Sequence, residues 1–379
     1  MPPSITTRSP DFVVVGGGIV GLWTAFEAAR QGLSATLLEQ RTIGAGASGG
    51  LLGALMPHQP TGWTDKKQFQ LDGLLSLETE IAELEALTGI STGYRRCGRI
   101  MPIRNAEKRR QSGDWAQASR ERWPAPFRWD VSDETPDATW LPPAEMPFGI
   151  NADTLSARVS PRGLLSALRQ AAEMSGVTIR EGVAVEQIEA DGKLRTTDDE
   201  IAAGHVVLAA GWQTFGLIEA LLAAPAGTGV KGQAALLRPA IPVDPALPIL
   251  YDNGTYVIAH ADGHVAIGST SENTFGDPLT TDERLEAVIK HATSLCPALK
   301  DAEVIERWAG VRPKAAGREP LVGPLPGLSG VSVATGGFKI SFAIAHLMAK
   351  AVVSLSRGET PDTLPQAFLP ENRVRPLPC

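Results

Sequence analysis

One glycine-rich segment near the N-terminus limits what this chain can fold into more than any other feature does. Residues 11–21 read DFVVVGGGIVG, an apolar β-branched run followed by glycines. These glycines fall at G-x-G-x-x-G spacing, at Gly16, Gly18 and Gly21. Apolar residues then recur at helical spacing, and a second apolar run, ATLLE, ends at Glu39. The pattern predicts a βαβ unit whose first turn holds the pyrophosphate of a dinucleotide at the N-terminus of a helix.

The acid at the end of the second predicted strand indicates which dinucleotide is bound. Glu39 follows Gly21 by 18 positions, close to the roughly 20 expected for the carboxylate that binds ribose hydroxyls. An ordinary solvated carboxylate at a strand end is the alternative. The chain contains no second fingerprint of the same quality and no C-x-x-x-x-C redox pair. A permanently held flavin, FAD, is therefore favoured over NAD.

Size and charge exclude several classes of protein. A chain of 379 residues predicts about two domains, and its net charge of −7 without a basic run argues against a nucleic-acid partner. No signal peptide and no run of about 18 apolar residues is visible, so no transmembrane segment is expected. The three cysteines are widely spaced and predict neither a disulfide framework nor a metal site. We expect a cytoplasmic protein, with peripheral membrane association left open.

The order of segments predicts an α/β protein with a second, α+β domain. Stretches of α/β character at the beginning, middle and end are interrupted twice by other material. Residues 1–90, 151–225 and 309–379 are expected to form a discontinuous, Rossmann-like FAD-binding domain with a parallel sheet. Residues 91–150 and 226–308 are expected to form a substrate-binding domain on a mainly antiparallel sheet.

Local patterns predict several individual elements. An amphipathic helix over 68–87 is expected to bury one face, made of Leu71, Leu74, Leu75, Ile81, Leu84 and Leu87. Ser160 and Pro161 mark the start of another helix, and an apolar helix is expected over 341–356. Asp262-Gly263 predicts a two-residue turn between antiparallel strands. The four tryptophans of 115–140 either pack their own segment or cover a substrate pocket.

Several motifs together resemble one known family of flavoenzymes. The chain reads SPRGLLSAL at 160–168, VVLAAG at 206–211, WAGVRPKAAGREPLVGP at 308–324 and VATGGFKISFAIA at 333–345. With the N-terminal fingerprint, these segments resemble the FAD-dependent D-amino-acid oxidase, glycine oxidase and sarcosine oxidase group. The resemblance implies oxidation of a small amino acid or secondary amine to an imine by hydride transfer to flavin, followed by hydrolysis to the oxo acid. The electron acceptor would be oxygen or a quinone-type compound, and the protein could form a homo-oligomer.

The same resemblance implies where FAD is held. Residues 314–317 read KAAG, without the cysteine that attaches flavin in some sarcosine oxidase relatives, so FAD is expected to be noncovalent. The residues implied to contact FAD are Gly16, Gly18, Ile19, Val20, Gly21, Glu39, Gln40, Ala47, Ser48, Gly50, Val185, Ala210, Gly211, Arg312, Gly337, Phe338, Lys339 and Ile340.

Substrate-binding residues follow from the chemistry of a carboxylate and from the matching motifs. A planar, two-pronged cation suits a carboxylate, which makes Arg312 the candidate, with a structural ion pair as its alternative. Tyr256 would add a hydroxyl donor, or be only a buried strand aromatic, and Tyr251 could share its role. Lys339, where relatives often carry arginine, could contact substrate, flavin or solvent. His58 is a candidate catalytic residue, with a structural role as the alternative.

Two other functions remain open on the same fold. One is an FAD-dependent dehydrogenase of 2-hydroxy acids, whose carboxylate Arg312 would bind equally well. The other is a flavoprotein subunit that binds FAD inside a larger complex without a substrate of its own. Reduction of the flavin by amines, by hydroxy acids or by neither would separate the three.

Overall fold

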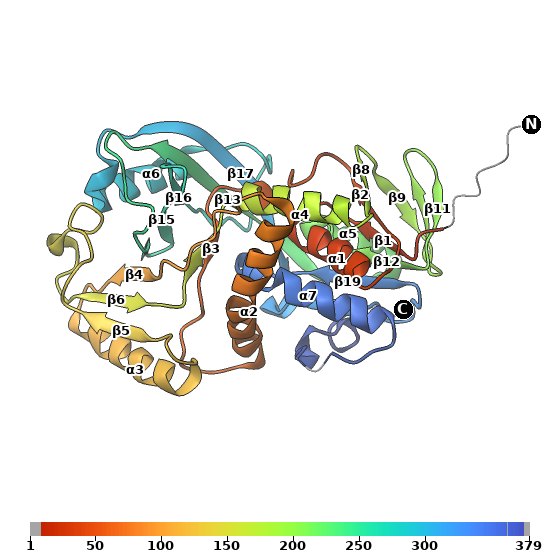
Figure 1. The fold of residues 1–379 in the computed structure, drawn as a ribbon, viewed down its shortest axis with the longest axis horizontal. Coiled ribbons are helices and arrows are strands. Elements are labelled where there is room, and N and C mark those ends of the chain that lie inside the picture. The colour runs from red at the N-terminus through yellow and green to blue at the C-terminus, as the bar shows by residue number, and fades with distance from the viewer. Residues whose placement is uncertain (1–8, 362, 375–379) are drawn as a thin grey trace, which may run out of the picture.

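The computed structural model describes residues 9–361 and 363–374, which form two sheets side by side (Figure 1). The first sheet has six strands in the order β18-β19-β12-β1-β2-β8. Five strands are parallel and only β18, at one edge, is antiparallel to its neighbour. The strands are β1 (Phe12–Val15), β2 (Ala35–Glu39), β8 (Thr178–Glu181), β12 (His205–Leu208), β18 (Leu321–Pro324) and β19 (Val331–Thr335).

Both faces of this sheet are covered, which explains why its central strands read as continuous apolar runs. Val14 and Leu37 join a core with the helices on one face, whereas Val13 and Leu38 point to the other face. The first face carries α1 (Ile19–Arg30), α2 (Asp65–Thr88), α4 (Pro161–Met174) and α7 (Ser341–Ser356). The second carries α5 (Thr214–Leu222) and a small sheet of β9 (Val185–Ile188), β10 (Lys193–Thr196) and β11 (Glu200–Ala202).

The second large sheet has eight strands in the order β17-β13-β16-β15-β14-β4-β6-β5. Neighbours are antiparallel except β14 and β4, so the expected, mainly antiparallel sheet is present. Its strands are β4 (Arg99–Pro102), β5 (Trp129–Ser132), β6 (Ile150–Asp153), β13 (Gly227–Arg238), β14 (Ile249–Asp252), β15 (Thr255–Ala259), β16 (Val265–Gly268) and β17 (Glu303–Ala315). Helices α3 (Ala106–Arg122) and α6 (Glu283–Leu295) pack on this sheet. A short pair, β3 (Ala54–Leu55) and β7 (Ala157–Arg158), completes the strands among the described residues.

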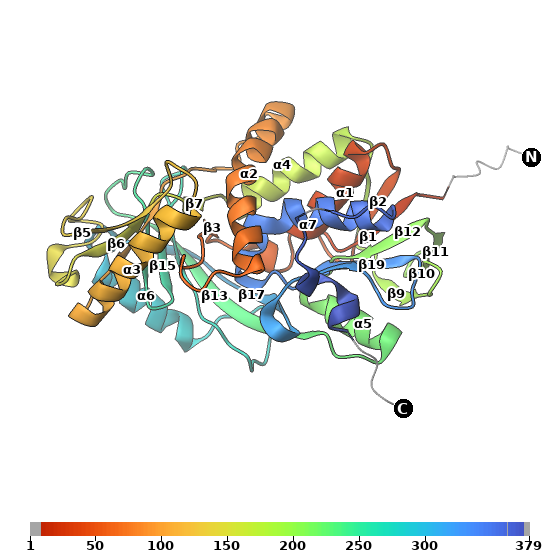
Figure 2. The same ribbon diagram turned by 90° about the horizontal axis from the view of Figure 1, so that it is seen from below.

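Helix α2 and the long strands β13 and β17 lie where the two sheets meet. In both views α2 stands between the two halves of the molecule (Figures 1 and 2). We propose that the chain divides into the two discontinuous domains expected from its sequence. In support, the strands of the six-stranded sheet all fall in the segments assigned to FAD binding. Strands β6 and β17 each cross one proposed boundary, near 150 and near 309.

Most locally predicted elements are present, with differences at their ends. Helix α2 is longer than the predicted 68–87, and Gly89, at φ 71°, ends it. Leu87 was expected to be buried but is 44% exposed. Leu87 lies in the last turn of α2, and the apolar spacing of the helix continues into this turn although the side chain there is not covered. The predicted hairpin between β15 and β16 is antiparallel, but its loop spans the five residues 260–264 rather than two.

The tryptophan-rich segment contains a helix that its sequence did not predict. Helix α3 buries only Ser112, Ala116 and Ser119, so it has no apolar period to recognise. It is held by aromatic contacts, since the rings of Trp115 and Trp123 lie 5.3 and 5.9 Å from that of Trp129. Packing of the segment therefore accounts for most of these tryptophans.

One helix of the described residues, Phe338–Ser356, is long and apolar enough to cross a membrane. Half of this segment is buried inside the protein, and α7, which forms most of it, packs against α1 and α2. A helix in the core of a folded protein passes the same test of length and composition. This feature therefore does not show a membrane span.

Candidate active site

A cavity of about 580 Å³ lies between the two large sheets and is lined by residues of both. Val15 and Leu38 reach it from the six-stranded sheet, and Ala234 and Tyr256 from the eight-stranded sheet. All the site residues predicted from the sequence line this one cavity except Gly21. The fold thus brings together residues that are separated by more than 300 positions in the chain.

One end of the cavity is the glycine turn between β1 and α1. A Cβ at Gly16 would lie 2.6 Å from the carbonyl oxygen of Ala209, and Gly16 also has a φ of 114°. A Cβ at Gly21 would lie 1.9 Å from the carbonyl oxygen of Gly16, so Gly21 allows the helix to approach the strand rather than lining the cavity. Only glycine fits either position.

The start of α1 is prepared for an anion. No side chain caps the helix at Gly18, and its first turn has no acidic residue. The backbone N–H of Ile19 donates to the Ser48 hydroxyl at 3.0 Å. The positive end of the helix dipole therefore faces the cavity beside Gly18 and Ser48, which fits a pyrophosphate group.

Glu39 lines the same end, and its carboxylate fixes the surrounding turn. One oxygen accepts the backbone N–H of Gly17 at 2.8 Å, and the other accepts that of Arg41 at 2.9 Å. An ionised carboxylate has about four acceptor sites, so two remain for ribose hydroxyls. Gln40 and Val185 line the cavity beside it.

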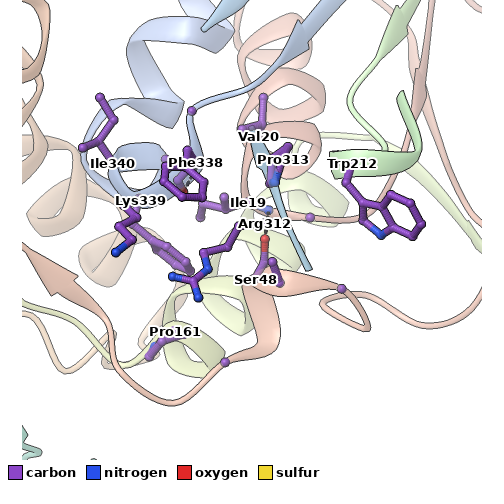
Figure 3. Close-up of a pocket in the computed structure, with 18 of the residues that line it drawn as sticks. Ile19, Val20, Ser48, Pro161, Trp212, Arg312, Pro313, Phe338, Lys339 and Ile340 are labelled. Atoms are coloured by element: carbon purple, nitrogen blue, oxygen red, sulfur yellow. Dashed lines mark hydrogen bonds between the residues drawn. The ribbon is translucent and has the colours of Figure 1, made fainter. Parts of the chain in front are cut away.

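Arg312 brings a half-buried cation to the other end of the cavity (Figure 3). Its Nη2 donates to the carbonyl oxygen of Thr270 at 2.7 Å, and its Cζ lies 5.8 Å from the centre of the Phe338 ring. Burial lowers the pKa of the guanidinium from its ordinary value. Among the described residues no carboxylate forms an ion pair with Arg312, so the structural ion pair considered above is absent.

Two tyrosines stand beside Arg312 on adjacent strands. Tyr251 of β14 lies directly opposite Tyr256 of β15, and their rings meet edge to face with centres 4.9 Å apart. Burial raises the pKa of Tyr256 to about 12, although Arg99 and Arg312 act in the opposite direction. The Tyr256 hydroxyl is therefore protonated near neutral pH and able to donate a hydrogen bond.

Lys339 reaches the cavity from the turn that precedes α7. Figure 3 shows its side chain on the same side of the cavity as Phe338 and Arg312. Its amine lies 5.8 Å from the centre of the Phe338 ring. Burial, and then repulsion from Arg312, lowers the pKa of Lys339. Two cations thus share this wall, which favours an anionic ligand.

His58 lines the cavity wall near α2. Its backbone N–H donates to Oε1 of Gln70 at 3.0 Å, and its ring Nδ1 contacts the same oxygen. Because the amide nitrogen of Gln70 donates to the carbonyl oxygen of Met56, this oxygen is an acceptor and Nδ1 carries the proton. Burial lowers the pKa of His58, so the ring is neutral near pH 7 with an unprotonated Nε2.

The structure also adds residues to the cavity that sequence reasoning missed. Trp308 is the first residue of the WAGVRP segment, four positions before Arg312, and could have been noticed there. Trp129 was expected only as one of four tryptophans that pack their own segment or cover a pocket, and it lines the cavity. Nothing in the sequence marked the others, because their places in the cavity depend on long-range packing. They include Gln70, Arg99, Met101, Trp212 and Ser269.

Comparison with known proteins supports the same interpretation. The sequence profile of the family described as FAD dependent oxidoreductase matches residues 11–352. The glycine oxidase of Pseudomonas putida is 28% identical over 372 residues, covering 97% of this chain and 100% of that protein. The bifunctional protein ThiO/ThiG of Synechocystis sp. is 29% identical over 381 residues, covering 95% of this chain; the chain spans about half of that protein, 54%.

A solved structure shows the same fold. The crystal structure of glycine oxidase from Geobacillus kaustophilus superposes with a TM-score of 0.86 at 24% identity, covering 95% of this chain and 98% of that one. The two sheets, the glycine cradle and the basic far wall of the cavity together define a flavin-dependent oxidoreductase. The chain belongs to the FAD dependent oxidoreductase family, as its motifs indicated, and FAD is its cofactor.

Proposed function

We propose that this enzyme oxidises a small amino acid or secondary amine, of the glycine, D-amino acid or N-methyl amino acid type. When bound, FAD would supply the two-electron chemistry, taking up the hydride that leaves the carbon next to nitrogen. Water would then hydrolyse the imine to the oxo acid, with release of ammonia or the amine. The observation that carries the proposal is Arg312, a half-buried guanidinium that has no carboxylate partner among the described residues and lines the same cavity as the glycine turn. The glycine oxidases among its relatives support this substrate class.

The roles of the cavity residues follow from their positions. Arg312 would hold the substrate carboxylate through its free N–H groups, and Tyr256 and Tyr251 would donate or accept beside it. A fixed carboxylate orients the reacting carbon, which is most of what the protein must supply. Lys339 would add positive charge to the same wall. His58 would keep its neutral Nε2 available as an acceptor for a proton.

The remaining predicted contacts are proposed for FAD. The small residues of the β1–α1 turn and of the loop around Ser48 would hold the pyrophosphate, and Glu39 the ribose. Attachment is proposed to be noncovalent, since neither Cys97 nor Cys296 lines the cavity. The proposed contacts are Gly16, Gly18, Ile19, Val20, Glu39, Gln40, Ala47, Ser48, Gly50, Val185, Ala210, Gly211, Gly337, Phe338, Lys339 and Ile340, with Gly21 shaping the turn.

Other properties are also proposals. Electrons would pass from the reduced flavin to oxygen or to a quinone-type acceptor. A cytoplasmic location follows from the sequence features discussed above, and a homo-oligomer is compatible with them. None of these properties affects the argument for the substrate class.

Replacing Arg312 tests the proposal. Purified holoenzyme is mixed anaerobically with a panel of glycine, D-amino acids, N-methyl amino acids and 2-hydroxy acids, and bleaching of the flavin absorbance is followed. We expect amino acids or amines to bleach it. We also expect Arg312→Ala to raise KM about 30- to 1000-fold, because a buried charge-assisted contact contributes about 2–4 kcal/mol.

Arg307→Ala is the matched control, since Arg307 lies on the same strand but pairs with Glu286 at the exposed face. It should leave KM unchanged. Bleaching by 2-hydroxy acids alone would replace the proposal with the dehydrogenase alternative. Bleaching by no compound, together with co-purification of a partner, would favour the non-catalytic subunit.

A further inference from the structure

A second arginine lines the cavity and is not used by the function proposed above. Arg99, on β4, is five strands away from β17 across the eight-stranded sheet and is only 6% exposed. Its Nε donates to a carboxylate oxygen of Asp153 at 2.7 Å. Within the part of the chain that the structure describes, its Nη2 has no hydrogen-bond partner, and Nη1 contacts only the sulfur of Met56 at 3.7 Å, a weak acceptor.

The guanidinium of Arg99 is held in place by its Nε edge and one face, and its Nη1–Nη2 edge lacks a strong acceptor. Asp153 is 3% exposed and is occupied, because it also accepts the backbone N–H of Ser156 at 2.7 Å and its hydroxyl at 3.0 Å. The ring of Trp129, which also lines the cavity, has its centre 4.8 Å from Cζ of Arg99. Ion pair and ring therefore fix one edge and one face of the guanidinium.

Burying an N–H group without an acceptor costs free energy, and native structures rarely contain such a group. Here Nη2 itself has almost no accessible surface, but it belongs to a residue that lines a cavity large enough for a ligand. A carboxylate carried by a ligand would give Nη1 and Nη2 the strong acceptor that neither has, with a small shift of the guanidinium to bring Nη2 to the cavity surface. The same chemistry places the first carboxylate at Arg312.

Tyr256 lies between the two arginines in the order of strands. It lies on β15, between the strands that carry Arg99 and Arg312, and both guanidiniums lower its pKa. Its hydroxyl is therefore within electrostatic range of both cations. A ligand bound at Arg312 would therefore have to extend past Tyr256 to reach Arg99.

We propose that Arg99 binds a second carboxylate of the substrate, so that the preferred substrate is an amino acid with two carboxylates. The second carboxylate would be carried by the side chain or by a substituent on the amine nitrogen. This inference rests on the proposed function and narrows its substrate class. Asp153 already balances the charge of Arg99, so the added contact is weaker than one to an unpaired cation.

The test compares dicarboxylates with neutral compounds of the same shape. Aspartate and glutamate, in both enantiomers, are compared with asparagine and glutamine, and N-carboxymethylglycine with its monoamide. Anaerobic bleaching of the holoenzyme flavin gives kcat/KM for each. We expect the best dicarboxylate to exceed its amide about 10- to 100-fold, and Arg99→Met to abolish this preference. Which pair shows the preference tells whether the second carboxylate is on the side chain or on nitrogen.

Two further variants separate binding from structural damage. Arg104→Met is the matched control, because Arg104 also pairs with a buried carboxylate, that of Asp252, but does not line the cavity. It should keep the preference. If Arg99→Met does not fold because Asp153 is left unpaired, the double variant with Asp153→Asn removes both charges and is measured instead.

A binding measurement makes the result independent of turnover. Succinate and glutarate are titrated into the holoenzyme and compared with butyrate, and perturbation of the flavin absorbance gives Kd. We expect tighter binding of the dicarboxylates, lost in the Arg99 variants. Equal behaviour of dicarboxylates and amides in the unmodified enzyme, or a preference that survives loss of Arg99, would overturn the inference. Failure of every amine to bleach the flavin would instead count against the proposed function, while the titration still reports on Arg99.

Discussion

At the scale of single residues, the site depends on a glycine that faces its principal cation. Gly232 lies on β13, next to the strand that carries Arg312, and a Cβ there would come within 1.7 Å of Nη2 of Arg312. The guanidinium would have to leave its position at the carbonyl oxygen of Thr270. The absence of a side chain at residue 232 therefore leaves room for the guanidinium of Arg312, 80 positions later in the chain.

Gly232→Ala should move Arg312 without touching the dinucleotide end of the cavity. We expect KM to rise at least about 10-fold, as for loss of a charged contact, while the flavin-to-protein ratio stays at the unmodified value. Steady-state kinetics and the absorbance ratio of the purified protein measure both. Gly276→Ala is the control, because a Cβ at Gly276 meets no atom within 4 Å. An unchanged KM for Gly232→Ala would mean that Arg312 does not bind substrate in the position described.

At the scale of elements, the close approach of α1 to β1 creates the dinucleotide end. Gly21 is one turn into α1, and its α-carbon faces the carbonyl oxygen of Gly16 at the end of the strand. The contact is between backbone atoms, so neither partner can turn aside as a side chain could. The helix must therefore move if residue 21 has a side chain.

Gly21→Ala should push α1 away from the strand and enlarge the turn. We expect FAD affinity to fall more than about 10-fold and the free energy of unfolding to fall by about 1–3 kcal/mol, as for other overpacked sites. Flavin fluorescence on titration and urea unfolding measure these changes. Gly276→Ala, outside the cavity and at a position where a Cβ meets nothing within 4 Å, should leave both unchanged. Normal FAD affinity in Gly21→Ala would contradict the close-approach argument.

At the scale of the whole molecule, buried histidines tie stability to pH. His346 of α7 is 1% exposed. Its ring Nε2 shares a hydrogen bond with the hydroxyl of Ser76 on α2. Burial lowers the pKa of His346 to about 3. His205, beside Ser332, has its pKa lowered by burial to about 4. Both rings are therefore neutral in the folded protein at pH values where the unfolded chain, with an ordinary pKa of 6.5, binds a proton.

Stability should fall as the pH is lowered from about 6.5 towards 4, since the unfolded state then takes up protons that the folded state does not. Each histidine contributes a slope of up to about 1.4 kcal/mol per pH unit. Urea unfolding with saturating FAD, repeated between pH 7 and pH 4.5, should show His346→Gln with a shallower slope than the unmodified protein. His291→Gln, at a side chain that is 42% exposed and pairs with Asp252, serves as the control for the substitution itself. An equal slope in all three proteins would show that His346 is protonated in the folded state.

Much of the FAD-binding part could be predicted because its signals are local. The glycine spacing, the acid at Glu39, the cap at Ser160 and the apolar period of 341–356 each depend on residues within a few turns of one another. The structure contains the corresponding strands, helices and N-terminal cap, in which the Ser160 hydroxyl accepts the backbone N–H of Gly163. Helix α3 was not predicted because aromatic contacts, rather than an apolar stripe, hold it in place.

The sequence by itself determined the class of fold, the cofactor and the glycine turn proposed to hold the dinucleotide, because helix geometry and backbone sterics act over short distances. Tertiary structure alone decided the strand order of the eight-stranded sheet and what that order brings together. Arg99 and Arg312 share one cavity because pairing between distant strands places them there. What these two arginines can bind depends on which of their N–H groups the strand pairing leaves without acceptors. No local sequence pattern encodes that outcome.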